Sequence, residues 1–130
     1  MCIRDRHLAI WVEDLEEMQD FYMRYFNAKS NNLYHNQGKE FKSYFLTFDS
    51  GARVELMHKP RLQKISNPSD AIMGYAHFAM SLGSSQQVDD LTERLRVDGY
   101  SILGEPRTTG DGYYESVIQD PEGNRIELTV

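Results

Sequence analysis

The chain contains an internal repeat, and a repeat restricts the fold to architectures that are built from similar modules. Residues 7–12 (HLAIWV) are echoed by residues 77–82 (HFAMSL), which lie 70 positions later. Toward the end of each copy, Arg-Val-Glu-Leu at 53–56 matches Arg-Ile-Glu-Leu at 125–128, 72 positions later. We therefore expect a duplicated unit.

The 130 residues have the length of one ordinary domain, so both copies belong to a single domain. We expect the modules to span residues 6–59 and 75–130, with a linker over 60–74. The linker contains Pro60 and Pro68 among several polar residues, which are unfavourable for a helix or a central strand.

A capping box marks the start of a helix in each module. Asp14 and Glu17 form it in the first module, and Ser84 and Gln87 form it in the second. Gly99 is suitably placed to end the second helix. Apolar residues follow the first box at helical spacing: Leu15, Met18, Phe21, Tyr22, Tyr25 and Phe26.

Each expected helix is preceded by one strand and followed by three β-like stretches that are separated by turn residues. The element order is therefore βαβββ twice, which is an α+β fold. The three stretches are 32–36, 43–48 and 53–58 in the first module, and 100–106, 114–119 and 125–130 in the second.

Strand alternation places one histidine and one glutamate of each module opposite the apolar face. These are His7 and Glu55, and their repeat partners His77 and Glu127. Glutamate is depleted in strands, so its repetition beside a repeated strand-starting histidine indicates a function. If the polar face is concave, the four side chains converge, and imidazole and carboxylate groups are ligands for divalent metals.

Other polar residues lack repeat partners or lie on helix faces, and we expect them to be solvated. They are His35, His58, Asp89, Asp90 and Glu93.

Composition excludes several classes of partner. The net charge of −6 and the pI near 5.1 argue against nucleic acid or an anionic membrane as a partner. No apolar run approaches the roughly 18 residues of a membrane helix. The single cysteine, Cys2, excludes an internal disulfide and agrees with a reducing cytoplasm, where we expect the protein to reside.

In these motifs the chain resembles the vicinal oxygen chelate superfamily, which includes glyoxalase I, fosfomycin-resistance enzymes, methylmalonyl-CoA epimerase, extradiol dioxygenases and bleomycin-binding proteins. The resemblance rests on residues 7–10 with 14–26, on 74–79 and on 120–128. It implies that the paired modules form an open, cup-shaped mixed sheet around one divalent metal ion per site.

The resemblance also implies which residues bind the metal, since His7, Glu55, His77 and Glu127 match the ligand positions of the family. Fosfomycin-type transferases and dioxygenases typically have no acidic ligand at the position of Glu55, so the set is closest to that of glyoxalase I. This implies a metal-dependent lyase or isomerase that moves a proton next to a metal-chelated carbonyl of a small oxygenated substrate. Glu127 would be the base and Glu55 its counterpart; Ni, Co, Zn, Mn or Fe suits the ligands.

Two positions depart from glutathione-dependent glyoxalases, in which an arginine and an asparagine hold glutathione. Trp11 and Lys59 occupy these positions here, which favours a different small oxygenated or thiol-linked substrate. Trp11, Met57, Tyr75 and Tyr113 are candidates for the pocket wall, with ordinary packing as the alternative.

Two other functions are compatible with the resemblance. One is a thiol transferase or an epoxide-opening antibiotic-resistance enzyme, and the other is a metal-free antibiotic-binding dimer like the bleomycin-resistance proteins. The presence of all four ligand types argues against the metal-free binder. The resemblance also implies a homodimer with shared sites. In this dimer one chain supplies His7 and Glu55, and its partner supplies His77 and Glu127.

Overall fold

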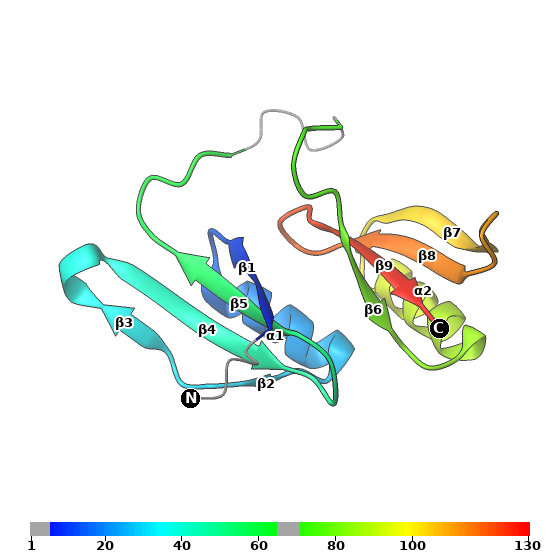
Figure 1. The fold of residues 1–130 in the computed structure, drawn as a ribbon, viewed down its shortest axis with the longest axis horizontal. Helices are drawn as coiled ribbons and strands as arrows, with labels where there is room; N and C mark the ends of the chain where they lie inside the picture. Colours follow the sequence, from blue (N-terminus) through cyan, green and yellow to red (C-terminus); the bar gives the residue numbers. More distant parts are fainter. Residues whose placement is uncertain (1–5, 65–70) are drawn as a thin grey trace. The chain divides into compact units, whose positions relative to one another are not determined.

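The computed structural model describes residues 6–64 and 71–130, so Cys2, Pro68 and the middle of the expected linker lie outside the described residues. The chain divides into two compact units, Met1–Ile65 and Ser66–Val130, and each has its own helix and sheet (Figure 1). Among the described residues, no helix is both long enough and apolar enough to cross a membrane.

The first module is a five-stranded mixed sheet with one α-helix against it. The sheet order is β1-β5-β4-β2, and β3 also pairs with β4. β1 and β5 are parallel, whereas the other pairs are antiparallel. The elements are β1 (His7–Trp11), α1 (Leu15–Phe26), β2 (Lys29–Ser30), β3 (Tyr34–Asn36), a 3₁₀ turn (Gln37–Lys39), β4 (Phe41–Thr47) and β5 (Arg53–His58).

The second module repeats this plan with four strands in the order β6-β9-β8-β7. β6 and β9 are parallel, as β1 and β5 are, and the remaining pairs are antiparallel. The elements are β6 (Phe78–Ser81), α2 (Ser85–Val97), β7 (Ile102–Thr108), β8 (Tyr114–Gln119) and β9 (Arg125–Thr129). The prediction of an α+β chain made of two repeated modules is confirmed.

One strand of the first module differs from the expected pattern. Instead of a single strand over 32–36, two short strands, β2 and β3, pair with successive parts of β4. Between them, the Asn31 side chain accepts a hydrogen bond from the Phe45 backbone N–H at 2.8 Å. This side chain takes the place of a ladder carbonyl, which interrupts regular pairing.

Both helices begin where the capping boxes predict. Asp14 Oδ1 accepts a hydrogen bond from the Glu17 N–H at 3.0 Å, and Ser84 Oγ accepts one from the Gln87 N–H at 3.2 Å. The first helix ends at Phe26 and is followed by the cap residue Asn27, which is left-handed with φ 53°. Gly99, with φ 92°, follows the second helix as expected, because glycine enters this conformation without steric strain.

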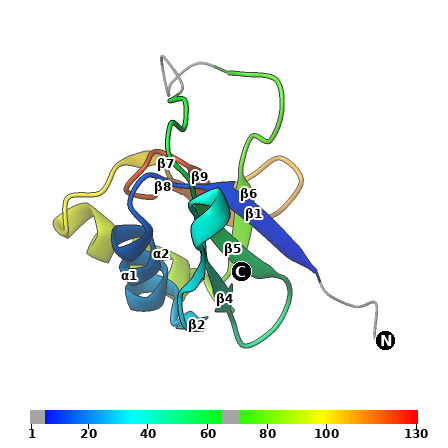
Figure 2. The ribbon, with the colours of Figure 1, turned by 90° about the vertical axis from the view of Figure 1, so that its left-hand side faces the viewer.

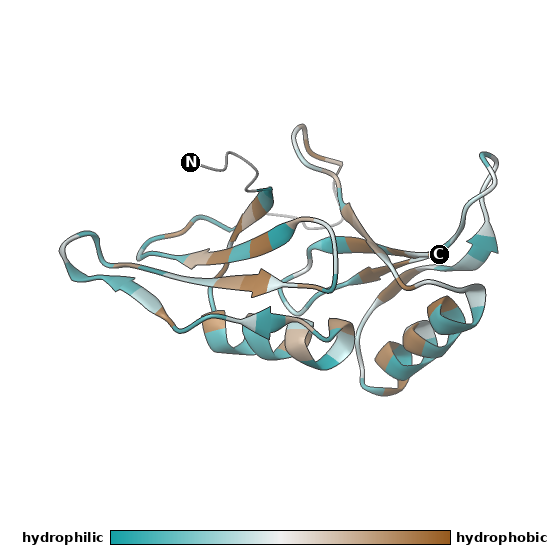
Figure 3. Cartoon of the chain, turned by 60° about the horizontal axis from the view of Figure 1, so that its bottom comes forward, coloured by the Kyte–Doolittle hydropathy of each residue, from teal (hydrophilic) through white to brown (hydrophobic). Residues whose placement is uncertain are grey.

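The core of each module lies between its helix and one face of its sheet (Figure 2). All six apolar residues predicted for the first helix are buried. Hydrophobic and hydrophilic positions alternate along the strands (Figure 3). In β5, Val54 and Leu56 are buried whereas Glu55 is turned to the other face. Alternation therefore leaves the polar face of each sheet free of the helix.

Candidate metal and substrate site

The first module brings His7 and Glu55 together on its polar face. β1 and β5 pair in parallel, with Ala9 opposite Glu55. His7 lies two residues before Ala9 on β1, so its side chain is on the same face of the sheet as that of Glu55. His7 Nε2 is 3.8 Å from Glu55 Oε1, and the side chains are 35% and 14% exposed. We call these two residues the first donor pair. Both are within reach of a ligand that approaches this face.

An aromatic ring lies beside the first donor pair. Phe45 of β4 is opposite Glu55 in the antiparallel register. Its ring meets His7 edge-on, with centroids 5.4 Å apart. The Arg53 guanidinium lies over the same ring, 4.3 Å from its centroid. His7 is thus held by an aromatic contact as well as by its neighbouring carboxylate. Sequence reasoning did not single out Phe45.

The second module brings together His77 and Glu127, which we call the second donor pair. Ala79 is opposite Glu127 in the parallel pairing of β6 and β9, which repeats the Ala9–Glu55 relation. His77 directly precedes β6. Its Nε2 is 2.8 Å from Glu127 Oε1, and the side chains are 42% and 22% exposed. This imidazole and carboxylate are within hydrogen-bond distance.

A further carboxylate, which sequence reasoning missed, lies next to the second donor pair. Glu115 of β8 is diagonal to Glu127, since Val117 is the residue opposite Glu127. Burial raises the pKa of the Glu115 carboxyl, and the charge of Glu127 and a hydrogen bond with Glu127 raise it further. The negative charge of Asp111 also raises the Glu115 pKa, whereas the positive charge of Arg107 lowers it. The sequence did contain a signal for Glu115. Pairing the two expected strands as an antiparallel hairpin, 114–119 with 125–130, would have placed Glu115 near Glu127.

The donor chemistry of both pairs suits a divalent transition metal, because imidazole nitrogen and carboxylate oxygen are its usual protein ligands. Each module on its own supplies two donors. Over residues 6–64 and 71–130, no group of three or more His, Cys, Asp or Glu side chains is arranged to hold a metal ion. The joint ligand set of both donor pairs therefore stays a prediction from the repeat.

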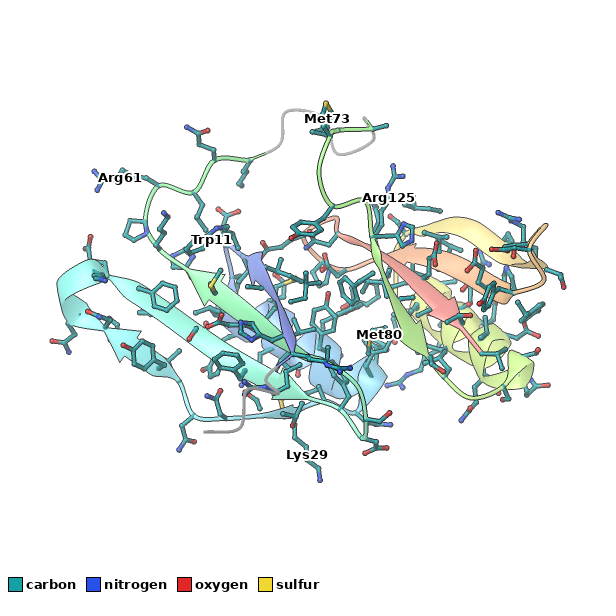
Figure 4. All side chains as sticks on the ribbon, viewed as in Figure 1. Trp11, Lys29, Arg61, Met73, Met80 and Arg125 are labelled. Carbon is teal, nitrogen blue, oxygen red and sulfur yellow. The ribbon has the colours of Figure 1, made fainter. Side chains whose placement is uncertain are left out.

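The four residues considered for a pocket wall have different environments. Trp11 and Met57 are opposite one another on β1 and β5, and Trp11 is 47% exposed (Figure 4). Tyr75 is 95% exposed and Tyr113 is 61% exposed. Ordinary core packing, the alternative for all four, is excluded for the two tyrosines. Lys59, which follows β5, has its Nζ 4.7 Å from the Trp11 ring centroid.

The loop over 108–113 is a tight hairpin connection between β7 and β8. The Thr109 N–H donates to the Tyr113 carbonyl at 2.7 Å, and the Gly112 N–H donates to the Thr109 carbonyl at 3.0 Å.

Two residues expected to be solvated have structural contacts instead. His58 Nδ1 is 2.8 Å from the Val12 carbonyl oxygen, which ties β5 to the end of β1. Asp89 of α2 accepts a hydrogen bond from the Tyr114 hydroxyl at 2.5 Å. Both side chains are only partly exposed, and neither contact was predicted because each partner is distant in the sequence. His35 is exposed, as predicted.

The chain matches the family model of the glyoxalase/bleomycin resistance protein/dioxygenase superfamily over residues 6–128. Among curated proteins it is 37% identical over 59 residues to the uncharacterized protein YqjT of Bacillus subtilis. That match covers 43% of this chain and 46% of YqjT.

Solved structures share the fold. A glyoxalase I mutant from Zea mays has a TM-score of 0.78 at 26% identity, covering 97% of this chain and 44% of the maize chain. The trypanothione-dependent glyoxalase I of Leishmania major has a TM-score of 0.77 at 22% identity, covering 98% and 86%. A glyoxalase family protein from Enterococcus faecalis has a TM-score of 0.77 at 18% identity, covering 98% of both chains. The match therefore spans less than half the length of the maize and B. subtilis proteins.

Proposed function

Starting from the fact that the chain belongs to the glyoxalase/bleomycin resistance protein/dioxygenase superfamily, we propose that it is a metal-dependent lyase or isomerase of the glyoxalase type. The substrate is a small molecule with adjacent oxygens, and the reaction moves a proton next to a carbonyl. The observation that carries this proposal is the repeated donor pair. Each module sets one imidazole and one carboxylate side by side on the polar face of its sheet.

The chemistry of the four side chains would suit a divalent ion that also binds substrate. His7, Glu55, His77 and Glu127 would hold the ion through two imidazole nitrogens and two carboxylates, and adjacent substrate oxygens would bind the same ion. When bound, the metal supplies Lewis-acid polarisation of the carbonyl. The donor types suit Ni, Co, Zn, Mn or Fe, with one ion per site.

Proton transfer is assigned to the glutamates of the two pairs. A base must reach the carbon-bound proton of the substrate, so its carboxylate has to be accessible. Glu127 is 22% exposed and Glu55 is 14% exposed, which favours Glu127 as the base. His77, at 2.8 Å, orients the Glu127 carboxylate, and Glu55 serves as the counterpart on the opposite side of the substrate.

We further propose a cytoplasmic homodimer that shares its sites. One chain contributes His7 and Glu55, and its partner contributes His77 and Glu127. Large apolar side chains before β6 support a covering partner, since contiguous exposed apolar surface is typical of interaction sites. They are Ile72 (53% exposed), Met73 (100%) and Tyr75 (95%). The low cysteine content supports the cytoplasmic location.

Metal content tests the proposed function. We expect purified protein, prepared with ample metal, to hold about one divalent ion per site in elemental analysis. His77→Ala should lose the metal, because it removes one of four ligands and leaves Glu127 without its partner. Glu93→Gln, on the exposed part of α2, should retain it. Less than about 0.2 ions per chain in the parent protein would contradict the proposal and favour a metal-free antibiotic binder.

Mixing two variant chains tests the shared site. His7→Ala and His77→Ala homodimers each lack one ligand in both sites. If the sites are shared between chains, a heterodimer of the two variants has one site without either histidine and one complete site. Equal mixing, with refolding, should restore metal binding to about a quarter of the sites. No restoration, although light scattering and mass spectrometry show heterodimers, would place all four ligands in one chain.

A further inference from the structure

Four side chains at one end of the first sheet form an exposed cluster of aromatic rings and one cation. They are Trp11, Tyr34, Phe41 and Lys59, which we call the aromatic–lysine cluster. The Trp11 and Phe41 rings meet edge-on with centroids 6.2 Å apart, and Tyr34 lies 6.2 Å from Phe41. Lys59 Nζ lies over the Trp11 ring at 4.7 Å. The rings come from three strands, so strand pairing fixes their arrangement.

The cluster and the first donor pair occupy the same face of the sheet. Along β1, Trp11 lies four residues after His7, and positions of equal parity share a face. Along β4, Phe41 and Phe45 are related in the same way, and Phe45 contacts His7. Four strand residues span about 13 Å. One small molecule can therefore reach from the donor pair to the cluster.

The exposure and charge of the cluster indicate what it binds. Trp11 is 47% exposed and Tyr34 is 53% exposed, whereas the four aromatic residues of α1 (Phe21, Tyr22, Tyr25 and Phe26) are buried. Within the described part of the chain, no acidic side chain forms an ion pair with Lys59. Its ammonium is held over an aromatic face and is available to an anion. Planar rings beside a free cation suit a planar aromatic group that carries a negative charge.

We propose that the aromatic–lysine cluster is the specificity subsite for the distal part of the substrate, and that this part is a planar aromatic group bearing a carboxylate. The inference rests on the proposed function for the reacting end of the molecule. The aromatic group contacts Trp11 and Phe41, with Tyr34 at the side, and Lys59 pairs with the carboxylate. The adjacent oxygens of the same molecule then lie near His7 and Glu55.

Binding of 2-naphthoate tests the subsite directly. Trp11 is the single tryptophan of the chain, so its fluorescence reports on the cluster. We expect naphthoate to quench it with a Kd of roughly 0.1–1 mM, as for a small ligand in an open site. Two comparison compounds separate the recognition elements: 2-naphthylmethanol has the rings without the charge, and cyclohexanecarboxylate has the charge without the rings. Each should bind at least about fivefold more weakly.

Matched variants locate the binding. Lys59→Met keeps most of the side-chain length and removes the charge, and we expect it to weaken naphthoate about five- to tenfold. Lys29→Met is its control, because Lys29 lies on β2 away from Trp11 (Figure 4). Variants of Trp11 lack the fluorescent reporter, so their naphthoate binding is measured by calorimetry. Trp11→Leu should lower the affinity for naphthoate about as much as Lys59→Met does, whereas Trp11→Phe should retain part of the affinity. Equal affinity in the parent, Lys59→Met and Trp11→Leu would overturn the inference.

Metal dependence and protein concentration distinguish other causes. The titrations are run with EDTA and with added Ni²⁺. Binding that persists in EDTA and depends on Lys59 supports the subsite even if the protein holds no metal and the proposed function fails. Binding that requires Ni²⁺ and ignores Lys59 places the carboxylate on the metal and overturns the subsite. Because dissociation of the proposed homodimer could itself change Trp11 emission, all titrations are run at a protein concentration where light scattering shows one constant mass.

Discussion

In the first module His7 Nε2 lies 3.8 Å from Glu55 Oε1, whereas in the second His77 Nε2 lies 2.8 Å from Glu127 Oε1. The histidines and glutamates are repeat-related and lie on equivalent strands. The residue on the neighbouring middle strand also differs between the modules. Phe45 is opposite Glu55, but Val117 is opposite Glu127. The larger ring contacts His7 edge-on, so this imidazole has an aromatic partner that valine does not offer His77.

The second difference is one of charge. Ser43 is buried two residues before Phe45, and the equivalent position before Val117 is Glu115. The first donor pair therefore has an aromatic neighbour, and the second has an acidic one. Duplication preserved the ligand types while the surrounding residues diverged. If the proposed function holds, the first donor pair would face the aromatic part of the substrate, and the second would lie in the more acidic environment where Glu127 is the proposed base.

The largest expected effect is a loss of stability from substitutions in the two module cores. Here we expect the modules to behave alike. Leu56 and Leu128 are repeat-related and fully buried, with 0% exposure. Replacing either by alanine should lower the free energy of unfolding by about 2–5 kcal/mol, because it removes buried methyl groups and leaves a cavity. Urea unfolding measures both. A loss below about 1 kcal/mol for one leucine alone would show that the cores have diverged as well.

A somewhat smaller effect is expected on turnover, and it should differ between Glu127 and Glu55. Glu127→Gln keeps the side-chain size but removes the proposed base, so turnover should fall roughly 10²-fold or more. Glu55→Gln should act mainly through the metal, whose affinity should fall about 10–100-fold in either variant. The measurements are kcat/KM on a substrate found by screening hemithioacetals, epoxides and acyl-CoA epimers, and metal affinity, with Glu93→Gln as the control. Wild-type turnover in Glu127→Gln would show that Glu127 is not the base.

A tyrosine hydroxyl in each module bonds to a helix carboxylate, and these two bonds should differ in strength. The Tyr114 hydroxyl donates to Asp89 at 2.5 Å, whereas the Tyr44 hydroxyl donates to Glu16 at 3.4 Å. We expect Tyr114→Phe to lower the Tm by roughly a few degrees, and Tyr44→Phe to lower it less. Thermal unfolding followed by circular dichroism measures both changes.

The pH dependence of the Tyr114 effect has a definite sign. The hydrogen bond to Asp89 raises the pKa of Tyr114 above its usual 10.0, with burial adding to the effect. The stabilisation is therefore complete below pH 10.0 and is lost as the pH rises through the higher folded pKa. The stability difference between the parent and Tyr114→Phe should shrink in that range. A difference that stays constant would contradict the hydrogen bond.

The smallest effect concerns Glu115 in the absence of metal. Burial, followed by the charge of Glu127, raises the pKa of the Glu115 carboxyl above 4.5. The folded state therefore favours protonated Glu115, and stability is lost as the pH rises through the folded pKa. Glu115→Gln should be slightly more stable than the parent at pH 7 and equal to it at low pH. Ser43→Gln in the first module, which has no neighbouring acidic pair, should not show this pH dependence.

Much of the fold was predictable because local chemistry specifies it. The Asp14 and Ser84 caps, the buried stripe of the first helix and the face of each strand follow from spacing along the chain. The interruption between β2 and β3 was not predicted, since it depends on Asn31 reaching Phe45 on another strand. The contacts of Asp89 and His58 were not predicted for the same reason. Their partners, Tyr114 and Val12, are distant in the sequence.

The sequence by itself determined which residues share the polar face, because side chains alternate along a strand with a period of two. It therefore identified His7, Glu55, His77 and Glu127 as two equivalent pairs. The tertiary structure decided what surrounds each pair, since neighbours such as Phe45 and Glu115 are set by strand register and not by separation along the chain. Pairing between distant strands brings each histidine beside its glutamate, at 3.8 and 2.8 Å, and assembles the aromatic–lysine cluster.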